Sequence, residues 1–445
     1  MWTHCLLMEG NNQTHMKQLS ERSLLLLLAA VQFTHIMDFM IMMPLGPQLM
    51  RVMDISAGQF AAFVAAYTLS SGVVGLLAAP FIDRFDRKKL LLFTYAGFTL
   101  GTLTCALSDN AASLLIARAV SGAFGGLSIS MVMAIVGDVV PAERRAAGVG
   151  IVMTAFSVAA ALGIPFGLKL AQMFRWETPF FVLAGIASVM WTIALLKLPP
   201  VRGHLENGRS KRAFFELLRD ANAGRALLFM VATVLGHFTI IPLLSPYLVK
   251  NVGLPERYLF LVYLTGGVLT VFTGPQIGRF ADRFGRRRIF SVLVVIASFV
   301  TLFIANSGRL PVWAVLVSGG AFFIFASGRF VPGQAIMTLA VPASRRGAFM
   351  SLSGCARDLA MGLASGVAGW IVTTAPSGKL VNFHWLGWIA VAAGAVSIWL
   401  GGHVRVHESD SVLPVQGELD VLPVISAKIA PLGGLPLNPE PSIEN

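Results

Sequence analysis

Five aspartate and arginine residues interrupt the long apolar stretches of this chain. Asp38 and Arg118 lie in its first half, and Arg329, Arg357 and Asp358 lie in its second. A charged side chain within a long apolar segment is costly unless it faces a polar space or an opposite charge. Loss of water around a carboxylate favours its protonated form, so such a group is also suited to load and release protons. These five residues are therefore the first candidates for chemistry.

Asp38 and Arg118 are expected at similar depth in their helices. Asp38 comes about 22 Å into its segment at the helical rise of about 1.5 Å per residue, and Arg118 about 9 Å into a segment that runs the opposite way. Two interpretations of Asp38 stay open: it exchanges a proton, or it forms a fixed ion pair with Arg118. In the second half, an ion pair of Asp358 with Arg329 is likewise one of the alternatives.

The composition predicts that lipid surrounds most of the chain. Hydrophobic residues make up 56% and charged residues 13% of the sequence, whereas soluble domains carry about 25% charged residues. Mean hydropathy is +0.73. Segments of about 20 apolar residues can cross a bilayer. We expect an all-α membrane protein with about twelve spans, at residues 23–43, 60–82, 90–107, 112–136, 146–173, 179–198, 226–249, 258–277, 289–305, 312–341, 348–374 and 385–402.

Two basic signatures occur twice in the sequence. Residues 83–89 (DRFDRKK) recur as 282–288 (DRFGRRR), 199 positions later, and residues 141–145 recur as 342–346, 201 positions later. A unit of about 200 residues has been duplicated, as in many carriers. The duplication predicts two pseudo-symmetric six-helix bundles. The expected organisation is a cytoplasmic segment at 1–19, bundles at 20–198 and 225–403, a basic cytoplasmic linker at 199–224, and a largely disordered tail at 404–445.

The net charge of +12 comes from arginines and lysines that concentrate in alternate loops. This distribution follows the positive-inside rule and predicts that both termini lie in the cytoplasm, with the chain in the plasma membrane of a bacterium. It argues against nucleic-acid binding. The three cysteines are far apart, so no metal site or disulfide framework is expected, and no cofactor is implied.

Several motifs together resemble the major facilitator superfamily, and within it the twelve-span proton antiporters of the drug and arabinose-efflux type. Residues 83–89 and 278–288, the two copies of the first signature, match the loop motif G-x-x-x-D-R-x-G-R-R/K of that family. Residues 118–125 (RAVSGAFG) resemble its fourth-span motif, and residues 163–167 (GIPFG) its fifth-span antiporter motif. The resemblance covers roughly residues 20–404.

The resemblance implies roles for the matching residues. The loop signatures would latch one conformation through Asp83, Arg84, Arg87, Asp282, Arg283 and Arg286. Gly163, Pro165 and Gly167 would form a hinge and seal, although close packing explains them equally well. Asp38, with Arg118, would be the proton-coupling site. In the first loop copy Asp86 replaces Gly285; because Asp tolerates a positive φ, we expect the turn to survive there.

The leading hypothesis for function is a monomeric secondary transporter that exports a small organic molecule against protons. An uncoupled facilitator or lipid carrier of the same fold, with a structural Asp38, is the alternative. A receptor or enzyme is disfavoured, since no P-loop or nucleophile and base pattern stands out. The surplus of arginines over aspartates in the spans favours an anionic or amphipathic substrate, unless the arginines are paired. The candidates for substrate contact are Phe39, Tyr67, Phe156, His237, Tyr263, Arg329, Gln334, Arg357 and Asp358.

Overall fold

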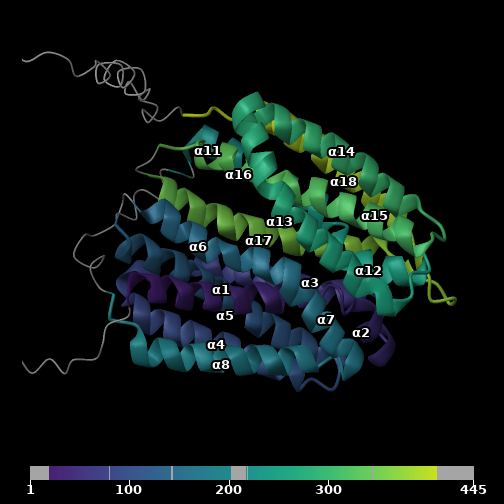
Figure 1. Cartoon of the computed structure of the whole chain (residues 1–445), viewed down its shortest axis with the longest axis horizontal. Coiled ribbons are helices and arrows are strands. Elements are labelled where there is room, and N and C mark those ends of the chain that lie inside the picture. Colours follow the sequence, from purple (N-terminus) through teal and green to yellow (C-terminus); the bar gives the residue numbers. More distant parts are fainter. Residues whose placement is uncertain are drawn as a thin grey trace, which may run out of the picture. The chain divides into compact units, whose positions relative to one another are not determined.

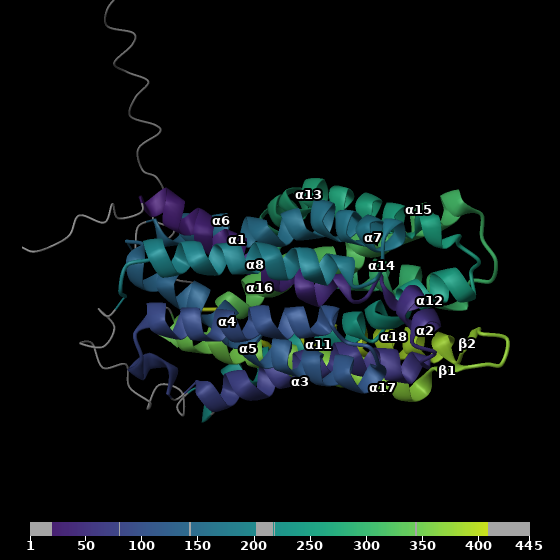
Figure 2. The same ribbon diagram turned by 90° about the horizontal axis from the view of Figure 1, so that it is seen from below.

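Long apolar helices make up most of the protein. The computed structural model describes residues 20–79, 81–141, 144–201, 217, 219–342 and 345–407. The predicted N-terminal segment, most of the basic linker and nearly all of the tail lie outside these residues. The described chain up to Val406 belongs to one compact unit, drawn in Figures 1 and 2.

The first half contains the first six predicted spans, several of them built from more than one helix. Its elements are α1 Glu21–Ile41, α2 Gly46–Val52, α3 Ala57–Ala78, the 3-10 turn η1 Ile82–Arg84, α4 Arg87–Ala106, α5 Ala111–Val139, α6 Arg145–Val158, the π-helical turn η2 Ala159–Gly163, α7 Ile164–Met173 and α8 Thr178–Lys197.

The second half repeats the order of the spans, but its π-helical turn interrupts the fourth span of the half instead of the fifth, and a short hairpin precedes its last helix. Its elements are α11 Ala221–Phe238, α12 Ile241–Lys250, η3 Glu256–Tyr258, α13 Leu259–Phe284, α14 Arg286–Asn306, α15 Val312–Phe322, the π-helical turn η4 Phe323–Ser327, α16 Phe330–Thr338, α17 Arg346–Ile371, the antiparallel strands β1 Thr373–Thr374 and β2 Leu380–Val381, and α18 Phe383–His403.

Eleven segments of the described chain are long and apolar enough to cross a membrane. The remaining predicted span, residues 348–374, is α17, which has the length, at 26 residues, but carries Arg357 and Asp358 near its middle. It packs against α3 of the first half and α11 of the second. The prediction of an all-helical protein with about twelve spans is thus confirmed.

The first span of each half is broken at its far end. The first span passes from α1 to α2 through a turn that contains Pro44, and the seventh passes from α11 to α12 at Thr239 and Ile240, just before Pro242. Proline lacks the backbone N–H that continues a helix, which accounts for breaks at these positions. Asp38 and His237 lie in the last turn before the respective break.

The two copies of the loop signature adopt different turns. Gly285, between α13 and α14, has φ 93°, a conformation that glycine adopts without strain. Asp86 has φ −57° instead, and its carboxylate caps α4 by accepting the backbone N–H of Lys88 at 2.9 Å. The expectation that Asp86 preserves the glycine turn was therefore wrong. A carboxylate can satisfy the free N–H groups at a helix start, whereas glycine has no side chain to do so.

The apolar cores differ between the two ends of the helices. We call the end with the α3–α4 and α13–α14 loops the basic end, and the end with α2, α12 and the hairpin the opposite end (Figure 2). One cluster at the opposite end, the shared core, combines side chains of both halves, such as Phe60 and Phe383. At the basic end each half has a separate cluster, around Tyr95 in the first and around Phe290 in the second.

Candidate functional site

The ionisable residues of the first half meet in a buried ion pair. Arg118 Nη1 donates to Asp38 Oδ2 at 2.8 Å and to the carbonyl oxygen of Asp38 at 3.2 Å. The hydroxyl of Thr102 donates to Asp38 Oδ1 at 3.0 Å. Both charged side chains are 0% exposed. The sequence placed Asp38 and Arg118 at similar depth, and the structure brings them into contact; proton exchange by Asp38 stays a prediction.

Three helices position this pair. Asp38 is in the last turn of α1, Thr102 is on α4, and Arg118 is in the second turn of α5. Tyr67 of α3 covers the guanidinium of Arg118, with 4.4 Å between Cζ and the ring centre. Within the described part of the chain, Arg118 Nε and Nη2 and the Tyr67 hydroxyl have no hydrogen-bond partner. A guanidinium with unused donors can change its contacts when its helix moves, so this pair can respond to conformation.

Arg329 is the buried cation of the second half. It is 2% exposed, its Nη2 donates to the carbonyl oxygen of Thr233 at 3.4 Å, and its Nε has no hydrogen-bond partner among the described residues. No ion pair between described residues involves Arg329. The predicted alternative of an ion pair between Arg329 and Asp358 is therefore not found.

Asp358 instead connects the two halves. The hydroxyl of Ser71 on α3 donates to Asp358 Oδ2 at 2.6 Å, and Arg357 Nε lies 3.3 Å from Asp358 Oδ1. The Arg357 side chain is 45% exposed and that of Asp358 is 15% exposed. The adjacent pair on α17 is thus self-neutralising, and its carboxylate bonds to the opposite half.

Aromatic rings join the neighbourhoods of Arg118 and Arg329. The ring centre of Phe39 lies 5.5 Å from that of Tyr67 and 6.0 Å from that of Phe238, which in turn lies 5.4 Å from His237. Phe39 and Phe238 are 199 positions apart, the spacing of the loop signatures, so they are equivalent residues of the two repeats. The candidates Phe39, Tyr67 and His237 therefore lie in one group, to which the structure adds Phe238.

Three other substrate candidates lie apart from this group. Phe156 on α6 is 49% exposed. Tyr263 is buried, with its hydroxyl 2.7 Å from that of Ser245. Gln334 is exposed on α16 and its Nε2 lies 3.8 Å from Met350 Sδ. Phe156 and Gln334 therefore have no described contact that supports a shared role with that group. Tyr263 is linked to His237 through the rings of Phe323 and Phe322, with successive centre distances of 5.6, 5.7 and 5.6 Å.

The loop signatures form different contacts in the two halves. Arg286 lies 3.6 Å from Asp282, with side chains 41% and 72% exposed, and Arg283 packs over Phe284. In the first copy, Arg87 is 1% exposed and its Nε donates to Asp138 Oδ2 of α5 at 3.2 Å.

Arg84 of the first copy is exposed and packs over the ring of Phe81. The side chain of Asp83 lies outside the described residues. Each of these contacts of the latch candidates stays within one half, so the role of the two loops as a latch stays a prediction.

The fifth span combines a widened helical turn with close packing. The π-helical turn Ala159–Gly163 precedes α7, and Pro165 follows in its first turn. A Cβ built on Gly163 would overlap Met37 Sδ of α1, and one built on Gly167 would lie 2.8 Å from Ile41 Cδ1. Close packing against α1 thus explains both glycines. The π turn disturbs the regular hydrogen bonding of the helix, which would suit a hinge. The hinge role itself stays a prediction.

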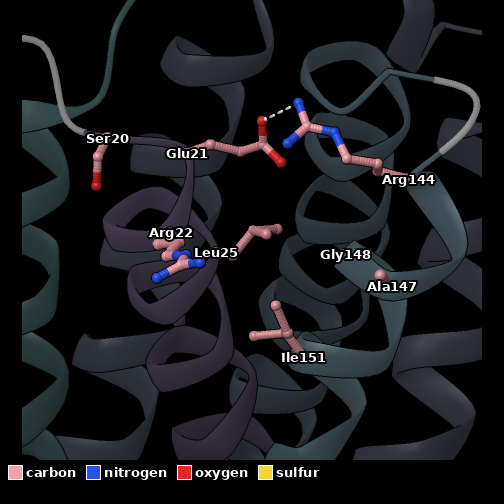
Figure 3. Close-up of a pocket in the computed structure, with 8 residues that line it drawn as sticks. All are labelled: Ser20, Glu21, Arg22, Leu25, Arg144, Ala147, Gly148 and Ile151. Carbon is pink, nitrogen blue, oxygen red and sulfur yellow. Dashed lines mark hydrogen bonds and ion pairs between the residues drawn. The ribbon is translucent and has the colours of Figure 1, made fainter. Parts of the chain in front are cut away.

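A surface crevice at the basic end lies between α1 and α6 (Figure 3). Glu21 and Arg144 face each other across it with an ion pair of 2.9 Å, and Leu25 and Ile151 line its floor. Both charged side chains are substantially exposed, and such pairs contribute little to stability. The crevice shares no lining residue with the Asp38 pair.

Sequence reasoning missed three polar or aromatic partners. Thr102 and Ser71 are ordinary residues of apolar helices, and only the packing of α4 and α17 shows which charges they contact. Phe238 had a usable signal, because adding the repeat spacing to Phe39 leads directly to it.

The sequence profile of the Major Facilitator Superfamily matches residues 28–264 and 226–432. Similar curated proteins include two uncharacterized MFS-type transporters of Bacillus subtilis (strain 168). YtbD is 25% identical over 371 residues, covering 80% of this chain and 88% of its own length. YceJ is 24% identical over 354 residues, covering 77% and 87%.

Solved structures share the fold at low sequence identity. A bacterial homolog of the human lysosomal transporter Spinster, in an inward-facing and unoccupied conformation, has a TM-score of 0.63 at 16% identity, covering 87% of this chain and 99% of the other. A mutant of the nucleoside transporter NupG has a TM-score of 0.66 at 11% identity, covering 86% and 100%. Together with the profile match, the helical architecture and its repeated motifs place this chain in the Major Facilitator Superfamily, a family of membrane transporters and not of enzymes.

Proposed function

We propose that this transporter exports a small organic molecule in exchange for protons, with Asp38 as the proton-coupling residue. The observation that carries the proposal is the ion pair of Asp38 and Arg118, fully buried in a membrane-spanning bundle. An acid in this environment is costly to keep, and it is a natural carrier of a proton across the low-dielectric region. Its single cationic partner gives the helices a way to favour or disfavour the charged form.

The contacts between the halves support alternating access. Hydrogen bonds that join described residues of the two halves lie mid-helix or at the opposite end. At the opposite end Arg51 pairs with Glu256 at 2.7 Å, and Gln172 donates to the carbonyl oxygen of Glu256 at 2.8 Å. The shared core lies at the same end. With the basic loops in the cytoplasm, as the positive-inside rule implies, this is an inward-open arrangement of a monomer with both termini cytoplasmic in a bacterial plasma membrane.

Protonation would couple to this rearrangement through Arg118. When Asp38 takes up a proton it loses its charge, and the attraction that holds α5 to α1 at this point weakens. Arg118 then relies on the Tyr67 ring and the carbonyl oxygen of Asp38. Because Tyr67 also touches Phe39 at the contact between the halves, the change reaches the surface along which the halves move.

The test uses purified protein in vesicles with an imposed pH gradient. A panel of labelled organic solutes, comprising ethidium, glucose and naphthalenesulfonate, is screened for gradient-driven accumulation that protein-free vesicles lack. We expect Asp38→Asn to abolish accumulation while exchange of solute for solute continues, because exchange needs no net proton movement. Asp109→Asn, which removes an exposed loop carboxylate, is the matched control. Accumulation by Asp38→Asn at the wild-type level would refute the coupling role.

An uncoupled carrier is the second candidate, favoured by the complete burial of the pair and its 2.8 Å contact. In that case Asp38 is structural. The Asn variant would then lose stability, because it leaves Arg118 buried without a counter-charge, and wild-type transport would not respond to the pH gradient.

A further inference from the structure

Arg329 carries a positive charge that the described protein does not neutralise. Of the three arginines predicted within the spans, Arg118 is paired with Asp38 and Arg357 with Asp358. Arg329 has only the Thr233 carbonyl oxygen at 3.4 Å, although it is 2% exposed. A buried cation that lacks an anion is unstable compared with one that has it. The resting protein therefore keeps a site that an anion would complete.

Local structure holds Arg329 in this position. The π-helical turn Phe323–Ser327 ends two residues before it, and π turns commonly occur at functional sites. On the facing helix α11, Gly236 lies beside the guanidinium, since a Cβ built there would make an ordinary contact of 3.5 Å with Arg329 Nη2. His237, the next residue, is 6% exposed and its Nδ1 has no hydrogen-bond partner within the described ranges. The unused Nε of Arg329 and the unused Nδ1 of His237 thus lie on two facing helices.

An apolar surface continues from this site to the contact between the halves. The ring of His237 lies 5.4 Å from Phe330, which follows Arg329, and 5.4 Å from Phe238. Phe238 faces its repeat equivalent Phe39 at 6.0 Å, and both rings are only half-buried although they lie between the two halves. Partly exposed rings at this place offer contact area to a planar apolar group.

We propose that Arg329 binds the anionic group of the transported molecule and that Phe39 and Phe238 contact its apolar ring. The substrate class is therefore an organic anion with an aromatic or similarly flat body. This inference rests on the proposed transport function. It assigns charge recognition to the second half and leaves the Asp38 pair of the first half for protons.

Binding to the purified protein in detergent tests the proposal without a membrane or a pH gradient. The probes are naphthalenesulfonate, benzoate and phenylphosphonate as aromatic anions, and naphthalenesulfonamide as the neutral counterpart of the first. We expect the wild type to bind at least one of the anions, and naphthalenesulfonate about tenfold or more tightly than the sulfonamide, because hydrogen bonds to charged groups are the stronger ones. Failure of all three anions to bind overturns the proposal.

Variants test whether Arg329 is the residue that binds the anion. Arg329→Gln should weaken binding of the aromatic anion about tenfold or more while changing sulfonamide binding less than about twofold. Arg329→Lys should retain part of the anion affinity. Arg309→Gln, which removes an exposed cation in a loop, is the matched control and should change neither. Equal anion affinity in wild type and Arg329→Gln contradicts the proposal.

The outcome is independent of the coupling test. If the wild type binds naphthalenesulfonate and naphthalenesulfonamide equally tightly, the anion site is overturned, even if Asp38→Asn abolishes proton-driven transport. Conversely, a bound anion whose transport ignores the pH gradient overturns coupling and leaves the anion site standing. Should Arg329→Gln fail to fold, the wild-type comparison and Arg329→Lys still decide the question.

Discussion

In the first half the buried guanidinium of Arg118 contacts the carboxylate of Asp38 at 2.8 Å, whereas in the second half the guanidinium of Arg329 has, among the described residues, only a backbone carbonyl oxygen at 3.4 Å. The helix breaks near these sites are alike, since Asp38 and His237 each precede a break and are followed by Phe39 and Phe238. The two arginines are not repeat equivalents, because Arg329 lies 211 positions after Arg118 and follows a π-helical turn. At these two breaks the duplicated chain thus kept the course of the backbone and changed the charged residues. In the roles proposed above, one half manages a proton and the other a substrate.

The difference between Arg118 and Arg329 should have its largest effect on the free energy of unfolding. Arg118→Met should lower the free energy of unfolding by about 3–5 kcal/mol, because it leaves Asp38 buried without its cation. Arg329→Met should leave the free energy of unfolding unchanged or raise it, since no described carboxylate depends on Arg329. Thermal and chemical unfolding in detergent would measure both.

A double variant checks the cause of this difference. Adding Asp38→Asn to Arg118→Met removes the orphaned charge and should recover much of the lost stability, as expected for coupled partners. If Arg329→Met destabilises the protein as strongly as Arg118→Met, the two sites are not different in kind and the comparison fails.

A second, smaller contrast concerns the loop signatures. Arg87→Gln should cost about 2 kcal/mol, because Arg87 is 1% exposed and bonds to Asp138 in a largely buried setting. Arg286→Gln, at the equivalent position of the second copy, should cost no more than about 0.5 kcal/mol, since its ion pair with Asp282 is exposed. Unfolding midpoints that fall equally in both variants would show that the two loops contribute alike.

The smallest expected effect concerns the conformational equilibrium. Among the described contacts, Asp282 touches only its own loop, so Asp282→Asn should hardly change the energy of this conformation. If Asp282 latches the other conformation, the variant should increase the population of this one. Spin labels at Lys89 and Arg288 would report a longer distance between the basic ends, with Asp109→Asn as the control. An identical distance distribution would leave Asp282 with a role in topology alone.

Much of the architecture was predictable because the bilayer imposes simple rules on helices. Length and hydropathy located the spans, the repeated signatures identified the halves, and the helical rise matched the depths of Asp38 and Arg118. The turn at Asp86 was mispredicted because its conformation depends on a choice between a side-chain cap and a positive φ, and both are open to aspartate.

The polar partners were less predictable because packing decides them. By depth alone, Asp358 could have paired with Arg329. Because α17 packs against α3, Asp358 instead accepts a hydrogen bond from Ser71. Arg329 was expected among substrate candidates, yet only its contacts show that it lacks a counter-charge. The two π-helical turns have no reliable sequence signature, since they depend on one extra residue within a continuous helix.

The shared core at the opposite end has a consequence for biosynthesis. Side chains such as Phe60 are covered in part by a cluster whose other members, such as Phe383, are translated more than 300 residues later. The first half therefore enters the bilayer with one end of its packing unfinished, while the cluster around Tyr95 can form at once. Maturation of this protein should end with the docking of two inserted halves, and a ribosome-bound first half is the species most exposed to premature association with other chains.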